Sequence, residues 1–127
     1  MRSLIAQSIA WAYAPGPEPH AEGDALDLGA EGSRAITVRG VAALERTVLD
    51  AAPVEGIVLR YAWLYGGGAS ARPAGSPGLH VDAAACAAVL AVERGAPGAY
   101  NIAEPSGLLS IDKARRELGW DPDFRRP

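Results

Sequence analysis

The stretch GIVLRYAWLYGGG, residues 56–68, decides the fold of this 127-residue chain. It opens with the apolar run Ile57 to Leu59, continues through arginine and aromatic residues, and stops at three consecutive glycines. A run of β-branched and aromatic residues bounded by glycine predicts a buried strand. Glycine tolerates positive φ angles and close backbone approach, so the strand should end in a loop that can contact a ligand. A core strand with a flexible exit is the alternative interpretation.

The segment before this stretch predicts one strand and one helix. Leu4 to Tyr13 is apolar except for a glutamine and a serine, which fits a buried strand; a short helix is the alternative. The acidic, glycine-rich run from His20 to Ser33 predicts a surface loop. From Ala35 to Ala51, apolar residues recur at a spacing of three to four, which predicts a helix. Its apolar face should comprise Val41, Leu44, Val48 and Leu49, with the charged residues Arg39, Glu45, Arg46 and Asp50 mostly on other faces.

The segment after the glycines predicts two more helices and one strand. Residues 69–78 are rich in alanine, glycine, proline and serine and should form a loop. An alanine-rich helix follows, with Asp82 as its N-cap and Gly95 just past its end. Residues 99–102 fit a short strand, and a last helix should end at Gly119. This alternation of strands and helices predicts an α/β fold.

Composition bounds the class of protein. The length fits a single domain, 1–127, with no linker long enough to separate two domains. The net charge of −3 argues against nucleic acid or an anionic membrane as a partner, and no apolar stretch reaches the ~20 residues of a membrane span. Cys86 is the single cysteine, so no intrachain disulfide can form and we expect a cytoplasmic location. We interpret His20 as a solvated loop residue and expect no metal site, because no second histidine or cysteine lies at ligand spacing.

Three stretches resemble one protein family. LRYAWLYGGG at 59–68 resembles a strand and loop written LRxxxxYGPG, and HVDAAACAAVLAVERGAPGAYNIAE at 80–104 resembles HVDDxA…G.YNI. KARRELGWDP at 113–122 resembles KARxELGW.P. In this order they are similar to the C-terminal portion of an extended short-chain dehydrogenase/reductase of the NAD-dependent epimerase/dehydratase family. The resemblance implies a partial Rossmann-like parallel sheet with flanking helices, oxidoreductase chemistry with NAD(P), and a small-molecule substrate.

The chain departs from this family in two features. The family begins with a strand and a G-x-x-G-x-x-G turn that holds the cofactor pyrophosphate at a helix N-terminus. The 127 residues contain no such turn, so we expect that the chain alone does not bind NAD(P), with about half of the cofactor-binding fold absent if the chain is complete. The family's Y-x-x-x-K pair is also missing, because Thr37 and Val41 occupy its two places.

The resemblance nevertheless indicates candidate site residues. Ser8 resembles the family's catalytic serine, and Tyr13 is a candidate to replace the lost phenol as an acid or base. A satisfied buried hydroxyl is the alternative for Ser8, and Tyr13 has no nearby cation in sequence to lower its pKa. Substrate contacts are expected from the decisive stretch, with core packing as the alternative for its aromatic residues. These candidates are Tyr61, Trp63, Gly66, Gly67 and Gly68.

Three hypotheses for function stay open at this point. The chain is a family member whose dehydrogenase activity is in doubt, a non-catalytic module that binds a small molecule or a protein, or one half of a split enzyme. In the last case a partner chain would supply the dinucleotide site. A homodimer is also expected, because the strand at 4–13 would leave an open sheet edge that carries no charge.

Overall fold

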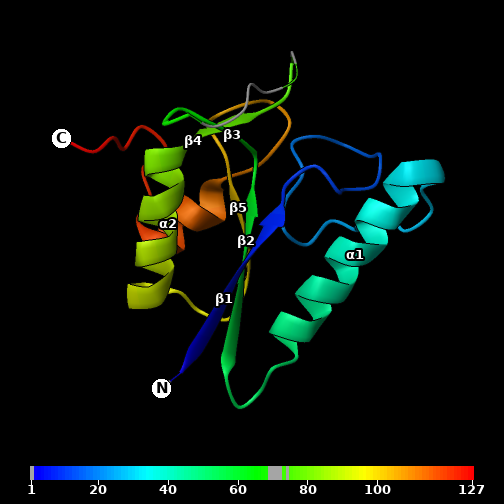
Figure 1. Ribbon diagram of the computed structural model, residues 1–127, viewed down its shortest axis with the longest axis horizontal. Coiled ribbons are helices and arrows are strands. Elements are labelled where there is room, and N and C mark those ends of the chain that lie inside the picture. The colour runs from blue at the N-terminus through cyan, green and yellow to red at the C-terminus, as the bar shows by residue number, and fades with distance from the viewer. Residues whose placement is uncertain (1, 69–72, 74) are drawn as a thin grey trace.

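The computed structural model describes residues 2–68, 73 and 75–127. Its main sheet is parallel, in the order β1-β2-β5, and a smaller parallel pair is formed by β3 and β4 (Figure 1). The strands are β1 (Ser3–Ile9), β2 (Glu55–Tyr61), β3 (Trp63–Tyr65), β4 (Gly78–His80) and β5 (Gly98–Ile102). The helices are α1 (Gly32–Leu49), α2 (Val81–Arg94) and the short π-helix η1 (Ala114–Leu118). Much of the predicted loop at 69–78, namely 69–72 and 74, lies outside the described residues.

The helices form a layer on each side of the main sheet. Helix α1 packs against β1 and β2 on one face, whereas α2 and η1 cover the other (Figure 1). This confirms the predicted α/β fold with a parallel sheet and flanking helices. The segment from Leu4 is a strand, so the helix alternative was wrong, and the strand ends at Ile9.

Strand β2 serves both layers because its side chains alternate. Ile57, Leu59 and Tyr61 belong to the large core under α2, together with the alanines of that helix. Val58 joins a much smaller cluster with Val48 of α1. Two cores of unequal size therefore flank the sheet, and the layer on the α1 side needs another source of stability.

Glycine at the start of the decisive stretch permits close contact with α1. A Cβ atom at Gly56 would lie 1.8 Å from the carbonyl oxygen of Val48, in the last turn of the helix. A contact this short excludes any side chain at that position, because the obstacle is backbone. The first residue of the stretch thus fixes how closely the end of α1 approaches β2.

The predicted strand at 56–65 is in fact two strands in two sheets. The amide of Ala62 donates to the carbonyl of Ile102 at 3.0 Å, and the next amide, of Trp63, donates to Pro77 at 3.1 Å. The chain therefore leaves the main sheet after Tyr61, and Trp63 belongs to the smaller pair. Tyr61 and Trp63 therefore do not lie on one face of a single strand, because alternation is interrupted where the hydrogen-bonding partner changes.

Helix boundaries required smaller corrections. Asp82 is in the first turn of α2 rather than its N-cap; the N-cap is His80, whose Nδ1 accepts the Asp82 amide at 3.1 Å. Gly95 is the C-cap, as predicted. Gly119 ends the last helix with a left-handed φ of 67°, also as predicted.

The inner face of α1 differs from the prediction at Glu45. The structure buries Ala35, Val38, Glu45 and Val48, whereas Leu44 and Leu49 are 41% and 40% exposed. Glu45 lies inside because Arg60, the even-numbered neighbour of Val58 on β2, points to the same side. The guanidinium donates to both carboxylate oxygens, with Nη2–Oε1 at 2.6 Å and Nε–Oε2 at 3.0 Å. Sequence analysis placed Glu45 away from the core because periodicity does not account for a buried partner.

We predict that this ion pair dominates the stability of the α1 layer. Glu45→Ala should lower the free energy of unfolding by about 3–5 kcal/mol, because it leaves the Arg60 charge buried without its partner. The double variant Glu45→Leu/Arg60→Met should cost less than the single one, since it removes the buried charge as well. Urea unfolding followed by circular dichroism measures both.

Asp27→Asn is the matched control for this prediction. It removes one acid from the pair that Asp27 makes with Arg34, whose side chains are 18% and 43% exposed. The loss there should be below about 1 kcal/mol. Equal losses in Glu45→Ala and Asp27→Asn would contradict the prediction.

Candidate functional site

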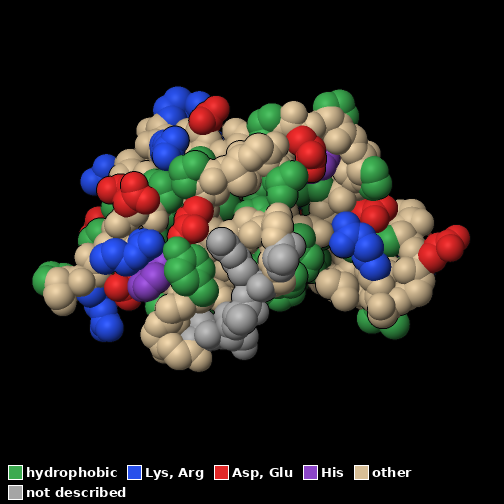
Figure 2. Space-filling model, turned by 90° about the horizontal axis from the view of Figure 1, so that it is seen from above, with side chains coloured by type: hydrophobic (Ala, Val, Ile, Leu, Met, Phe, Trp, Pro, Cys, Tyr) green, Lys and Arg blue, Asp and Glu red, His purple; other side chains and the backbone are tan. Residues whose placement is uncertain are grey.

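An apolar hollow lies where β1 and β2 end. It has a volume of about 260 Å³ and is mostly apolar. Its walls come from the exit of β1, the start of β3 and the segment before η1, and Figure 2 shows hydrophobic side chains across the middle of this end of the molecule. The lining residues are Ala10, Trp11, Tyr13, Ala14, Pro15, Glu18, His20, Ala62, Trp63, Pro77, Leu108 and Leu109. We call this hollow the aromatic pocket.

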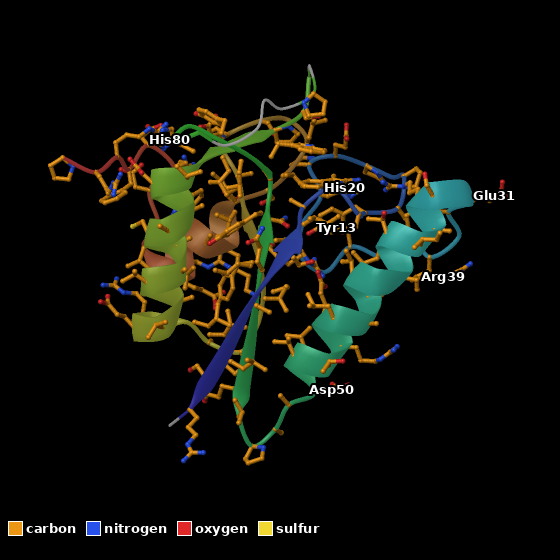
Figure 3. The ribbon with its side chains drawn as sticks, in the orientation of Figure 1. Tyr13, His20, Glu31, Arg39, Asp50 and His80 are labelled. Carbon is orange, nitrogen blue, oxygen red and sulfur yellow. The ribbon has the colours of Figure 1, made fainter. Side chains whose placement is uncertain are left out.

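Two aromatic stacks form the walls of the aromatic pocket. The rings of Trp11 and Trp63 are 4.1 Å apart at an interplanar angle of 9°. The ring of Tyr13 stacks on the imidazole of His20 at 4.9 Å and 8°. Figure 3 shows Tyr13 and His20 next to each other at the top of β1, whereas His80 lies at the top of α2 on the other side of the molecule. Planar side chains arranged this way favour a planar ligand.

The exit of β1 is fixed by α1 and by the loop before it. Arg34 donates to the carbonyls of Trp11 at 3.1 Å and Tyr13 at 3.2 Å. Its Nε is held by Asp27 at 2.9 Å. The two aromatic residues therefore have a defined backbone position although they lie beyond the end of the strand.

A buried polar network stands behind the Tyr13 wall. The Tyr13 hydroxyl donates to Asn101 Oδ1 at 2.6 Å and accepts from Arg60 Nη1 at 2.9 Å. Asn101 Nδ2 donates to the carbonyls of His20 at 3.2 Å and Ser110 at 3.1 Å. No buried side-chain nitrogen or oxygen among the described residues lacks a hydrogen-bond partner. The network positions the pocket wall, and it already uses the hydroxyl of Tyr13.

Burial raises the pKa of Tyr13 above its ordinary value of 10.0, and the nearby Arg60 only partly opposes this. The phenol is therefore protonated at neutral pH. Its ring faces the aromatic pocket while its hydroxyl faces the network.

The other predicted site residues lie in different environments. Ser8 is 4% exposed and donates to Glu45 Oε2 at 2.7 Å, on the α1 side and outside the pocket lining. Tyr61 donates to the carbonyl of Ala84 at 2.7 Å, on the α2 side. Of the seven residues proposed from sequence, Tyr13 and Trp63 line the pocket.

The three glycines adopt the positive φ angles expected of them, 84°, 54° and 87° at Gly66, Gly67 and Gly68. They lie beside α2 rather than in the lining of the aromatic pocket. A Cβ at Gly66 would come within 2.4 Å of His80 Nε2, so the loop passes directly over the helix cap. Whether a ligand contacts these glycines stays a prediction.

His20 was wrongly interpreted as a solvated loop residue. Its side chain is 13% exposed, and its backbone is held by Leu108 at 2.9 Å and Ser110 at 2.8 Å. Sequence analysis also missed Trp11, which lies within the predicted strand at 4–13 but beyond the end of β1 at Ile9, and which belongs to no motif. A glycine-rich acidic loop indicates exposure, and nothing in the local sequence reveals the tertiary contacts that cover most of the His20 side chain.

The described residues offer neither the family's proton-transfer pair nor a metal site. Thr37, in the place of the family's tyrosine, is exposed on α1 and donates to the carbonyl of Ser33. No group of three or more histidine, cysteine or acidic side chains that could hold a metal ion occurs among the described residues. No helix in the described ranges is long and apolar enough to cross a membrane.

Comparison with known proteins identifies the fold. No family model matches the chain. The UDP-glucose 4-epimerase of Thermotoga maritima, solved with UDP-glucose, superposes with a TM-score of 0.71 at 19% identity, over 98% of this chain and 59% of the epimerase. The UDP-N-acetylglucosamine 4-epimerase of Bacillus cereus gives a TM-score of 0.74 at 14% identity, over 98% and 59%. The dTDP-glucose 4,6-dehydratase of Bacillus anthracis, in complex with NAD, gives 0.71 at 12% identity, over 96% and 57%.

This chain has part of the epimerase/dehydratase fold. The fold that the resemblance implied is thereby confirmed. A curated relative, the 3-diazoavenalumate denitrifying reductase of a Streptomyces species, is 38% identical over 148 residues. The match covers 98% of this chain and 46% of the reductase, so the chain spans about half the length of the curated relative it matches.

We predict that buried tyrosines make the fold sensitive to alkali. Burial raises the pKa of Tyr61 from 10.0 to about 12. A raised pKa in the folded state means that the contribution of Tyr61 is fully present below pH 10 and is lost as the pH rises from 10 to 12. Between pH 8 and pH 11 the free energy of unfolding of wild type should therefore fall by about 1.4 kcal/mol more than that of Tyr61→Phe. Urea unfolding at the two pH values measures this, and parallel losses in both proteins would contradict it.

Proposed function

We propose that this chain forms the substrate-binding side of an NAD(P)-dependent reductase or a related oxidoreductase, and that the aromatic pocket binds a small, planar aromatic molecule. The observation that carries the proposal is the pair of aromatic stacks around an apolar hollow at the strand ends. Ligands in open α/β folds bind at this end of the sheet. A volume of about 260 Å³ suits a ligand of one or two rings rather than a sugar nucleotide.

The charges of the lining support an aromatic ligand over a sugar nucleotide. Among the described residues that line the pocket there is no lysine or arginine, and Glu18 contributes a carboxylate. A nucleoside diphosphate would need cationic partners that this wall does not offer. The reductase relative acts, by its name, on a diazo compound rather than on a sugar nucleotide, and this also favours the proposal.

The described residues do not fit the pyrophosphate of NAD(P). Helix α1 follows the acidic residue Glu31 and is not preceded by a G-x-x-G-x-x-G pattern, and the N-terminus of α2 is capped by His80. Asp82 in the first turn of α2 adds a negative charge and already accepts the amide of Arg126 at 3.0 Å. We therefore propose that the chain alone does not bind the dinucleotide. A partner chain or residues outside these 127 would hold it.

The second candidate is a module that binds a small molecule without chemistry. The specific observation in its favour is that Thr37 and Val41 stand in place of the tyrosine and lysine that the family uses for proton transfer. Both candidates require the aromatic pocket, so a test of aromatic binding serves both.

We predict that 4-nitroanisole, a neutral planar probe, quenches the fluorescence of Trp11 and Trp63 in a saturable way. Trp63→Ala should weaken binding about five-fold, because an aromatic contact contributes about 1 kcal/mol. The third tryptophan, Trp120, is buried and donates to Ala83, so it supplies an internal reference. Phe124→Ala, which removes an exposed aromatic ring outside the lining, should bind like wild type. Quenching that rises linearly with concentration, equally in all three proteins, would overturn the proposal.

We also propose that the chain self-associates through β1 and α1. Among the described residues β1 pairs with β2 alone, so its other edge is open, and no charged residue lies between Leu4 and Ile9 to oppose pairing. Helix α1 adds exposed apolar side chains next to this edge: Ile36, Leu44 and Leu49. Val48 is buried against β2 and is not available for such a contact. A second copy related by a two-fold axis would cover the edge and the helix together.

Sedimentation at micromolar concentration should then show a dimer. Its interface should bury more than ~1,000 Å², as expected of a stable contact. Leu44→Glu should yield a monomer with unchanged circular dichroism, because it places a charge in the contact. Val92→Glu is the matched control, since Val92 is 67% exposed on α2, away from this surface. A wild-type monomer, or a dimer that survives Leu44→Glu and dissociates in Val92→Glu, would contradict the prediction.

A further inference from the structure

His20 is held in place from several directions. Its imidazole stacks on Tyr13, and its backbone bonds to Leu108, Ser110 and Asn101. Its Nδ1 lies 2.9 Å from Asp24 Oδ2, and that same oxygen accepts the amide of Ala21. The imidazole therefore cannot rotate freely, although it belongs to a loop.

The Asp24 carboxylate determines which nitrogen of the ring carries the proton. The hydrogen bond from His20 is the main reason that the pKa of Asp24 is lowered from 3.8, so the carboxylate is charged above that pH. A charged carboxylate only accepts hydrogen bonds, so Nδ1 must donate. In the neutral ring Nε2 then has a free lone pair, which makes it a base.

The Nε2 edge is accessible. Within the described part of the chain Nε2 has no hydrogen-bond partner, while every buried side-chain nitrogen there has one. Nε2 is therefore not sealed from solvent. His20 lines both the aromatic pocket and a second hollow, whereas Asp24 lines the second hollow alone. The imidazole thus connects Asp24 to the aromatic pocket.

We propose that His20, oriented by Asp24, is the proton-accepting residue of the aromatic pocket, and that the ligand is a phenol whose hydroxyl donates to His20 Nε2. This inference rests on the proposed function, because it requires that the pocket bind an aromatic molecule. It adds the chemical class of the ligand and a second role for the pocket wall.

The proton moves between the phenol and His20, and no other reactant takes part. The phenol O–H bond breaks and its electrons stay on the oxygen as phenolate. The proton forms an N–H bond at His20 Nε2, and the resulting imidazolium keeps its Nδ1–H on the Asp24 carboxylate. Neither an oxidant nor a reductant is needed. The imidazolium returns its proton to the phenolate or to water.

Two acidic side chains lie near the His20 imidazole. Asp24 faces Nδ1, and Glu18 lines the same pocket. Tyr13 faces the ring as a neutral phenol, with Arg60 behind its hydroxyl. Leu108 and Leu109 contribute no charge. The hydroxyls of Ser8 and Tyr13 are both used in the network, which leaves His20 and the Glu18 carboxylate as proton acceptors in the described lining. Of these two, His20 is the one held in place by an aromatic stack.

The experiment compares 4-nitrophenol with its methyl ether, 4-nitroanisole. The phenolate form of 4-nitrophenol absorbs visible light, so absorbance reports the proton directly. In wild type the phenol should bind at least about five-fold more tightly than the ether, as expected for one added hydrogen bond. Bound 4-nitrophenol should ionise about one pH unit below the free probe, a ten-fold change in its ionisation constant. His20→Gln should remove the ionisation shift, and it should also weaken the binding of both probes a few-fold, because it takes away one ring of the Tyr13 stack.

Asp24→Asn provides a second variant whose site is exposed, so its folding does not depend on the pocket. It should reduce the ionisation shift by at least about half, because an amide no longer fixes the tautomer. Asp50→Asn, at the exposed end of α1, is the control and should leave the shift unchanged.

Each outcome decides the proposal. Loss of the shift in His20→Gln with retained ether binding supports it. A shift that persists in His20→Gln overturns the role of His20 but leaves the aromatic pocket intact as a binding site. If His20→Gln also fails to bind the ether, the Asp24→Asn variant decides. An unchanged ionisation shift of bound 4-nitrophenol in that variant overturns the proposal. Failure of wild type to bind either probe overturns the proposed function and this inference together.

Discussion

The buried ion pair of Arg60 and Glu45 is the interaction on which the α1 layer depends. Burial alone would lower the pKa of Arg60, but hydrogen bonds and charge from Glu45 outweigh burial and raise it, so the guanidinium is fully charged. The apolar cluster on this side of the sheet comprises only a few residues, and it cannot offset the desolvation of an unpaired charge. The pair is tolerated because Ser8 and Tyr13 satisfy its remaining hydrogen-bonding groups.

The same network joins the fold to the candidate site. Arg60 bonds Tyr13, Tyr13 bonds Asn101, and Asn101 holds the backbone of His20. One wall of the aromatic pocket is thus the outer end of a chain of hydrogen bonds that begins inside the α1 layer. A cooperative buried network of this kind specifies one arrangement of its members, which explains how a loop rich in glycine and proline presents an ordered imidazole.

Sequence reasoning succeeded where the signal was local. The apolar run from Ile57 to Leu59 correctly indicated a buried strand, and motif order correctly indicated the epimerase/dehydratase fold. Sequence reasoning failed where a partner distant in the sequence determines whether a side chain is buried. Helical periodicity assigned Glu45 to solvent, although a guanidinium on another strand draws it inside. Composition likewise assigned His20 to solvent. It could not reveal the contacts that hold His20, because Asn101 and Ser110 lie 81 and 90 positions away in sequence.

The aromatic pocket is assembled from segments that are distant in the sequence: Trp11 after β1, Trp63 in β3, and Leu108 before η1. None of these walls is present near another until the parallel sheet has formed, so the unfolded chain has no comparable site. Any occupant binds the folded state alone and stabilises it by RT ln(1 + [L]/Kd), about 2.7 kcal/mol when the ligand is at one hundred times Kd. That increment is a substantial fraction of an ordinary folding stability of about 5–15 kcal/mol. The melting temperature, and through it the amount of chain that escapes proteolysis, would then follow the concentration of the ligand.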